Sequence, residues 1–184
     1  TSNSCGELIK FNTTNNDFWF LCKNGVLYNN SNLMINHLDI DEAIDFIIHN
    51  QSIFILYKND DVYGVMELSF TDNDIFFEDY YQGFTNNYNA SFISASIVDG
   101  NFFLLTDEGV YSGDMDSDLK FASNWTLLNE LGIPRGLFTS EDNILLIFND
   151  YLNVVDINTN IITDTINFEL GDYIDFYVYG ELIY

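Results

Sequence analysis

The chain has 184 residues and a formal net charge of −24, from 29 acidic residues against 5 lysines and arginines. So few cations nearly exclude nucleic acid as a partner, because neutralising phosphates requires lysine and arginine, and they disfavour anionic membrane surfaces. Hydrophobic residues make up 47% of the chain and aromatic residues 17%, which argues for a packed core and against disorder. No apolar run reaches the roughly 18 residues of a membrane-spanning helix.

One hairpin pattern recurs four times along the chain. Each copy has an apolar run, a short polar tip, and a second run rich in β-branched or aromatic residues. The equivalent tip positions Gly25, Asp61, Gly109 and Tyr151 are separated by 36, 48 and 42 residues. Repeats of roughly 40–50 residues built from short strands indicate the blades of a β-propeller. The copies occupy residues 17–28, 52–63, 101–111 and 143–154.

Each copy extends into a sheet of four strands. The second strand is continuously apolar, as expected when both of its faces pack between neighbouring blades. The sequence therefore predicts an all-β chain that forms one β-propeller domain over residues 1–184, with about four four-stranded blades and a partial fifth. An open arc would leave blade faces unpaired, so we expect a fragment of a larger propeller. The predicted blades span residues 7–37, 43–81, 90–128, 136–167 and, for the partial blade, 173–184.

Two alternatives to this reading of the elements are open. Residues 38–46 and 124–131 could form short helices, although the repeat register favours strands for most of both segments. A β-sandwich would also explain the number of strands, but not the recurrence of one hairpin. Pro134 is the single proline in the chain. We therefore expect asparagine and aspartate, which tolerate the left-handed conformation, to supply most of the turns. Asp99-Gly100 is a strong signal for a two-residue hairpin.

The two cysteines, Cys5 and Cys22, are 17 residues apart. They can form a disulfide if the first two strands bring them face to face. Alternatively, Cys22 is a small buried hydrophobe within its apolar run. The chain begins without methionine or a positively charged leader, so we expect either a removed signal peptide or a fragment.

No catalytic, cofactor-binding or metal-ligating residue can be assigned from motifs. Asp114, Asp116 and Asp118 alternate in a turn and could offer oxygen ligands to Ca²⁺, but a complete calcium loop would need glycine and an acid where this chain has Leu119 and Trp125. A polar connection between two strands is the better explanation of these acids. The only histidines, at positions 37 and 49, lack a zinc-ligand spacing. Phosphate-binding loops and nucleophile elbows are absent from the sequence.

The aromatic residues of the second strands recur at one position in the repeat. That recurrence favours packing between blades over stacking on a ligand. Trp125, in the predicted outer strand, either braces a blade edge or presents an exposed ring. The recurring aromatic residues are Trp19, Phe20, Phe54, Phe102, Phe103 and Phe148.

Residues 101–128 resemble a blade of bacterial extracytoplasmic propellers. The resemblance rests on the hairpin Thr106-Asp-Glu-Gly-Val-Tyr111 and on Asn124-Trp125, with a partial match at residues 24–28. Such hairpins are typical of the ligand-sensing propellers of hybrid two-component regulators and of the amino-terminal propeller of the type IX secretion protein PorZ. The resemblance implies a non-enzymatic domain outside the cytoplasm that acts in sensing or in a secretion apparatus.

These observations favour a non-catalytic propeller that presents loops to a protein or glycan partner. The surfaces expected to meet that partner are the hairpin tips at residues 58–61, 107–109 and 149–150 and the connection 114–118. The alternative is a carbohydrate-active enzyme whose carboxylates converge on a central channel. The predicted inner strands offer Asp45, Asp99 and Asp175 for that role, at positions that do not match between blades.

Overall fold

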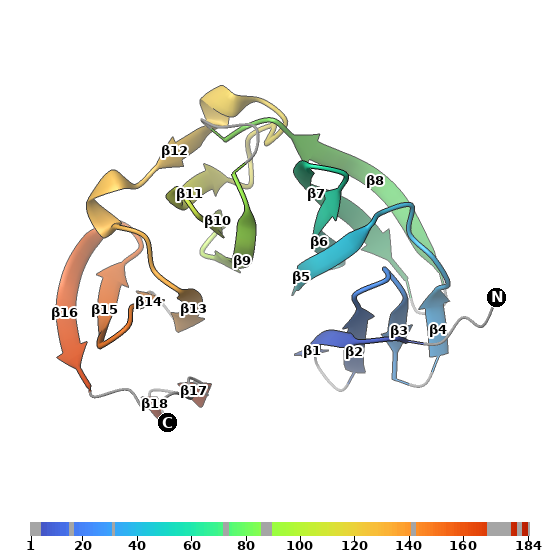
Figure 1. The fold of residues 1–184 in the computed structure, drawn as a ribbon, viewed down its shortest axis with the longest axis horizontal. Coiled ribbons are helices and arrows are strands. Elements are labelled where there is room, and N and C mark those ends of the chain that lie inside the picture. Colours follow the sequence, from blue (N-terminus) through green and yellow to red (C-terminus); the bar gives the residue numbers. More distant parts are fainter. Residues whose placement is uncertain are drawn as a thin grey trace.

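The chain forms four antiparallel sheets that stand around a curved arc (Figure 1), as seen in a computed structural model. The structure describes residues 5–14, 17–30, 32–71, 74–85, 90–140, 143–168, 178–179 and 182–183. Each of these four sheets has four strands, and their spatial order is their order along the chain. The prediction of four-stranded propeller blades is therefore confirmed, and we number the sheets as blades 1 to 4.

The sixteen strands of the four blades have the following bounds. Blade 1 contains β1 (Leu8–Thr14), β2 (Asp17–Cys22), β3 (Leu27–Asn29) and β4 (Asn32–Ile35). Blade 2 contains β5 (Glu42–His49), β6 (Ser52–Asn59), β7 (Val62–Phe70) and β8 (Ile75–Gln82). Blade 3 contains β9 (Phe92–Val98), β10 (Asn101–Thr106), β11 (Gly109–Asp114) and β12 (Trp125–Leu127). Blade 4 contains β13 (Gly136–Ser140), β14 (Asn143–Ile147), β15 (Tyr151–Asp156) and β16 (Ile161–Asn167).

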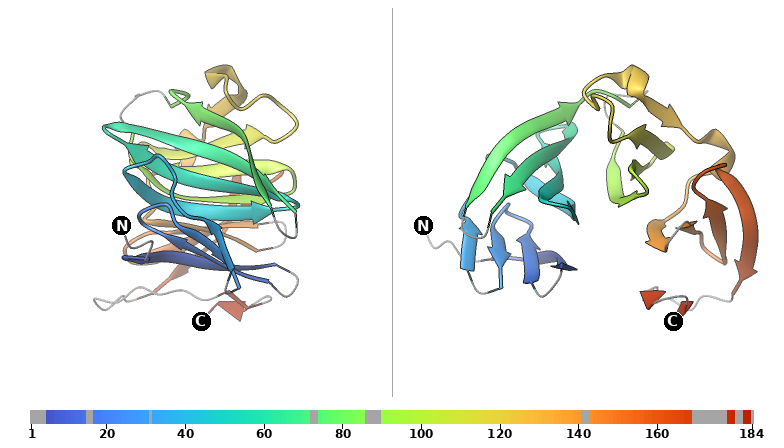
Figure 2. Two further views of the ribbon diagram at one scale, coloured as in Figure 1. Left: turned by 90° about the vertical axis from the view of Figure 1, so that its right-hand side faces the viewer. Right: turned by 180° about the vertical axis from the view of Figure 1, so that it is seen from behind.

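A two-stranded sheet follows blade 4, where the sequence predicts a partial fifth blade. It pairs β17 (Val178–Tyr179) with β18 (Leu182–Ile183). Most of the strand predicted from residue 173 lies outside the described residues. In each full blade the first strand lies toward the centre of the arc and the fourth strand at its rim (Figure 1; Figure 2, right). This radial arrangement excludes the β-sandwich alternative.

The second strands of blades 2 and 3 pack against both neighbouring blades, because alternate side chains point to opposite faces of a sheet. In β6, Ile53 and Ile55 belong to the core shared with blade 1, whereas Phe54 and Leu56 belong to the core shared with blade 3. In β10, Phe102 likewise faces blade 2 and the adjacent Phe103 faces blade 4. This two-sided burial explains why the second strands are continuously apolar in sequence.

The turns use asparagine and aspartate as predicted. Asn50 and Asp99 directly follow the inner strands of blades 2 and 3 and have φ angles of +55° and +47°. Asp99 is followed by Gly100 at φ +72°, so this turn has positive φ at both central residues, as the tight hairpin requires. These residue types adopt the left-handed conformation at low cost, which lets the chain reverse without proline.

The two segments for which the sequence allowed a helix, 38–46 and 124–131, form mostly strand or single 3-10 turns. Residues Glu42–His49 form β5, so the helical alternative for 38–46 is wrong for most of that segment. In the second segment, β12 is followed by one 3-10 turn at Asn129–Leu131, and another at Ala122–Asn124 precedes it. Among the described residues, no helix is long and apolar enough to cross a membrane.

A disulfide joins Cys5 to Cys22, with 5.5 Å between their Cα atoms. The disulfide prediction is therefore correct. Cys22 is fully buried, but as a bonded cysteine and not as the free hydrophobic residue of the alternative. The disulfide fastens the segment before β1 to β2, the strand that pairs with β1 in blade 1. On the same face of β2, Phe18 remains 52% exposed, although the equivalent side chains of blades 2 and 3 are buried against a preceding blade.

Candidate functional site

The loops divide between the two ends of the blades. The tips between second and third strands lie beside the connections that lead from one blade to the next. Asp60 N–H donates to the Asp41 carboxylate at 2.6 Å, and Ser91 N–H donates to the Asp107 carboxylate at 2.9 Å. The predicted contact surfaces at 58–61, 107–109 and 149–150 therefore share one end, which we call the connection end.

The fourth predicted surface, residues 114–118, lies at the opposite end. Met115 N–H donates to the carbonyl of Gly100, in the tip between the first two strands of blade 3, at 2.8 Å. The acids of this loop stabilise its own turns: Asp114 Oδ1 accepts from Asp116 N–H at 2.9 Å, and Asp118 Oδ1 accepts from Lys120 N–H at 3.1 Å. Within the described part of the chain, no three potential ligand residues cluster around a common metal position, so calcium binding here stays a prediction.

A cavity of about 490 Å³ lies at the centre of the arc, where the first strands of all four blades meet. Its walls are largely apolar, with partly exposed Ile93 and Phe138 among the lining residues. Charged side chains from three blades also line it: Lys10 of blade 1, Asp45 of blade 2 and Arg135, which directly precedes blade 4. We call this the central cavity and take it as the candidate functional site.

Asp45 holds three blades together within the central cavity. Its side chain is almost fully buried, and Oδ1 lies 2.7 Å from Lys10 Nζ of blade 1. Its other oxygen, Oδ2, accepts a hydrogen bond from Ala95 N–H of blade 3 at 3.1 Å. Because a buried carboxylate requires compensating partners, Lys10 and Ala95 account for the burial of Asp45.

Hydroxyl groups continue this polar wall from blade 3 to blade 4. Ser96 Oγ and Thr139 Oγ1 lie 2.8 Å apart across the two blades. Ser94 Oγ is buried and has no hydrogen-bond partner among the described residues. Buried hydroxyls are usually paired with protein, water or ligand, so Ser94 offers an unused polar group beside the cavity.

The charge of the central cavity is opposite to that of the chain. Lys10 and Arg135 are two of only 5 cationic residues in a chain of net charge −24, and both line the same cavity with one acid, Asp45. Asp45 already pairs with Lys10. The Arg135 side chain is exposed and forms no ion pair with any described residue. An arginine fork in this position can bind a carboxylate in bidentate fashion.

The three acids considered for glycoside hydrolysis do not converge in the described structure. Asp45 lines the central cavity, whereas Asp99 lies in the turn between β9 and β10, at the opposite end from the hairpin tips. Asp175 lies outside the described residues. Glycoside hydrolysis by the usual route needs two carboxylates about 5–10 Å apart, and the described lining of the cavity supplies one.

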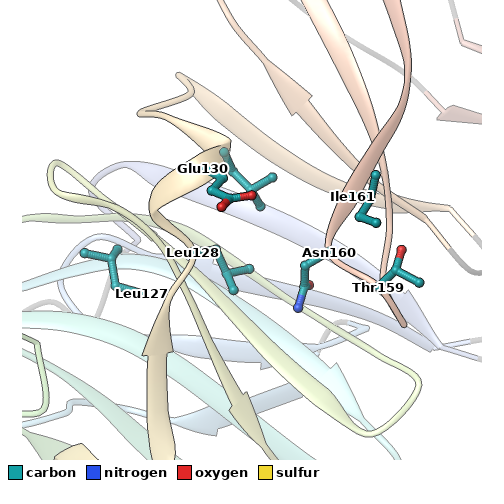
Figure 3. Close-up of a pocket in the computed structure, with 7 residues that line it drawn as sticks. Leu127, Leu128, Glu130, Thr159, Asn160 and Ile161 are labelled. Carbon is teal, nitrogen blue, oxygen red and sulfur yellow. The ribbon is translucent and has the colours of Figure 1, made fainter.

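A second cavity of about 310 Å³ lies at the rim between blades 3 and 4 (Figure 3). Leu127 and Leu128 line one side, and the turn at Thr159 and Asn160 lines the other. Leu131 also belongs to the lining. Asn160 Oδ1 is buried without a described partner. No charged group other than the exposed Glu130 lies in this cavity, so its described lining gives little indication of a ligand class.

The recurring aromatic residues pack mainly between blades, as predicted. Trp19, Phe54, Phe102 and Phe103 are fully buried in inter-blade cores, whereas Phe20 is only partly buried on the exposed face of blade 1. Phe148 stacks on Tyr151, with 4.5 Å between ring centroids.

Trp125 braces the edge of blade 3. Its ring stacks on Phe84 at 4.3 Å, and its Nε1 donates to the Leu119 carbonyl at 2.8 Å. Of the two roles that the sequence predicted for Trp125, bracing a blade edge is therefore correct, and the ring is not exposed.

Solved structures with the same architecture are propellers. A computationally designed protein, Ika8, superposes with a TM-score of 0.64 at 9% identity, over 96% of this chain and 54% of its own. The WD40 domain of Pan2 from Neurospora crassa superposes with a TM-score of 0.60 at 13% identity, over 88% of this chain and 52% of its own. Apo AztD from Citrobacter koseri superposes with a TM-score of 0.56 at 9% identity, over 95% of this chain and 52% of its own.

These likenesses establish the fold: the chain is an open, partial β-propeller. It spans about half the length of the solved structures it matches. No protein-family model matches the sequence, and no curated protein matches it. The comparisons therefore support a propeller in general, and they do not support the finer resemblance to PorZ or to two-component sensors.

Proposed function

We propose that this chain is a non-catalytic recognition module whose central cavity accepts a carboxylate group from a protein partner. The observation that carries the proposal is the gathering of Lys10 and Arg135 in one cavity of a chain with few cations. Arg135 supplies an unpaired fork, and Lys10 retains ammonium protons beyond the one directed to Asp45. The apolar walls would contact the carbon atoms next to the carboxylate.

The net charge of the whole chain limits the net charge of the partner protein. A net charge of −24 repels a strongly acidic protein. We therefore expect a neutral or basic partner that inserts one carboxylate, either a chain terminus or a single side chain. The acidic tips at the connection end, including Asp60, Asp61 and Asp107, would attract basic groups around that carboxylate and add to the specificity.

The disulfide supports a location outside the cytoplasm. Structural disulfides persist in oxidising compartments and are rare in the reducing cytosol, and Cys5 is bonded to Cys22. Recognition outside the cytoplasm agrees with the expectation from the resemblance of residues 101–128. The comparisons do not distinguish a secretory role from a sensory one.

Isothermal titration with two peptides tests the proposal. Both peptides carry lysines followed by a short neutral segment, and they differ only in a free or an amidated C-terminus. We expect the free carboxylate to bind about tenfold more tightly or better, because charge-assisted hydrogen bonds to arginine are strong. Equal affinity for the two peptides, or no binding of either, would contradict the proposal.

A further inference from the structure

The outer strand of blade 2 exposes an unusual number of aromatic rings. Phe76, Phe77 and Tyr80 of β8 are 51%, 59% and 54% exposed. The aromatic residues of the second strands, such as Trp19, Phe54 and Phe102, are instead buried between blades. The exposed rings of β8 therefore differ from the main pattern of the chain. Clustered exposed aromatic side chains often mark a surface that contacts a ligand or partner.

The register of β8 separates these rings onto two faces. Phe77 and Tyr80 lie opposite Leu68 and Met66 of β7, which pack on the core shared with blade 1. Phe76 lies opposite Ser69, on the other face of the sheet. Phe77 and Tyr80 therefore form a pair, with 6.4 Å between ring centroids and 39° between planes. This pair offers an aromatic platform at the rim.

A groove of about 270 Å³ runs beside the platform, between β8 and the connection from blade 1 to blade 2. Gln82 and Asn59 line it and bring amide groups, and Asp39 brings an exposed carboxylate. Gln82 Nε2 donates to the buried Tyr57 hydroxyl at 2.7 Å, which fixes the amide and leaves its carbonyl oxygen as an acceptor. The groove thus combines aromatic rings with both hydrogen-bond donors and acceptors.

We propose that this rim groove binds a neutral oligosaccharide. A pyranose ring has an apolar face of C–H groups that stacks on an aromatic ring, and hydroxyl groups around its edge that pair with amides and carboxylates. The groove supplies both kinds of contact side by side. The net charge of −24 repels acidic sugars and selects neutral ones. This site is separate from the central cavity, and the inference does not depend on the proposed function.

Saturation-transfer NMR with cellohexaose, xylohexaose, mannohexaose and maltohexaose tests the proposal. We expect transfer to the ring protons of at least one of these sugars. Phe77→Ala and Tyr80→Ala should each weaken that binding about tenfold, the scale of one lost aromatic contact. Tyr80→Trp should preserve it, since the platform remains.

Phe76→Ala is the matched control, because Phe76 is equally exposed on the same strand but points to the other face. It should leave sugar binding unchanged, as should Arg135→Gln in the central cavity. The platform residues are exposed, so their variants should melt like the parent chain. The proposal is overturned if none of the four sugars shows transfer, or if Phe76→Ala weakens binding as much as Tyr80→Ala does.

Discussion

The carboxylate of Asp45 lies 2.7 Å from the ammonium of Lys10, and these two residues belong to neighbouring blades 35 positions apart in the chain. The same carboxylate also accepts the Ala95 amide of blade 3. One side chain on the wall of the central cavity thereby fixes three blades in register. The polar groups of this wall have a structural role as well as any role in binding.

Asp45→Ala should lower the free energy of unfolding by about 2–3 kcal/mol, because the variant removes an ion pair and leaves the Ala95 amide without its acceptor. Chemical denaturation measures this change. Asp116→Ala is the control, since Asp116 is exposed and its loss should stay within about 0.5 kcal/mol. Equal effects of the two substitutions would show that Asp45 does not join the blades.

The ion pair between Lys120 and Asp79 predicts a pH-dependent contribution to stability. Lys120 lies in the loop after β11 of blade 3 and Asp79 in β8 of blade 2, so the pair links two blades. The hydrogen bond from Lys120 is the main cause that lowers the pKa of Asp79 below its ordinary value. A carboxyl group with a lowered pKa stabilises the fold above its unfolded pKa of about 4, and loses that contribution as the pH falls through its folded pKa.

Lys120→Met should therefore melt at a lower temperature than the parent at pH 7, and the difference should fade below about pH 4. Thermal melts across this pH range measure it. Adding Asp79→Asn to Lys120→Met should cause little further loss at pH 7. A melting difference that stays constant down to acidic pH would contradict the assignment to this pair.

Reduction of the disulfide should destabilise the chain. Cys5 and Cys22 close a loop with a sequence separation of 17 residues, for which loop-closure entropy predicts about 3 kcal/mol. Denaturation with and without reductant measures the loss. The Cys5→Ser variant should be about as stable as the reduced parent and should not respond to reductant. An unchanged midpoint on reduction would contradict a stabilising role for the bond.

Gly64 has no room for a side chain. A Cβ atom there would lie 2.7 Å from the ring of Tyr57, the residue opposite it in β6. Because Tyr57 is buried and bonded to Gln82, Gly64→Ala should cost about 1–3 kcal/mol through overpacking. Gly6→Ala is the control, since nothing lies within 4 Å of its added Cβ. Denaturation midpoints compare the two variants, and an equal response would refute this account of Gly64.

Calcium binding by the 114–118 loop can be tested by thermal shift. Asp114 and Asp118 each accept a backbone hydrogen bond within the loop, which explains their presence without a metal. We expect CaCl₂ and MgCl₂ at equal concentration to shift the melting temperature equally, by general screening of the negative charge. A shift specific to calcium and lost in Asp114→Asn would establish a site.

The repeat pattern predicted the blades because it follows from physical constraints that act locally. Continuous apolar runs such as 53–57 are visible in sequence, and positive-φ turns require residues such as Asn50 and Asp99. The bounds of individual strands were less accurate. For example, β11 extends to Asp114, whereas the sequence placed this residue in the following loop.

The central cavity was harder to predict, because it depends on blades that pack across long separations. Lys10 and Arg135 are 125 positions apart, and neither belongs to a motif. The available signal was their placement: Lys10 falls in a predicted inner strand, and Arg135 directly precedes another. The acids of the hairpin tips are more numerous. For this reason the sequence analysis predicted contact surfaces at the ends of the blades and not in the central cavity.

The most direct test of the central claim is the effect of Arg135→Gln on binding of the lysine-containing peptide with a free C-terminus. We predict that the substitution weakens binding about tenfold, by removing the unpaired guanidinium, while leaving the melting temperature unchanged. Lys120→Gln removes a cation in the loop between β11 and β12 of blade 3, away from the central cavity. This control should leave the affinity unchanged. If Arg135→Gln binds the peptide as tightly as the parent, the central cavity does not recognise the carboxylate.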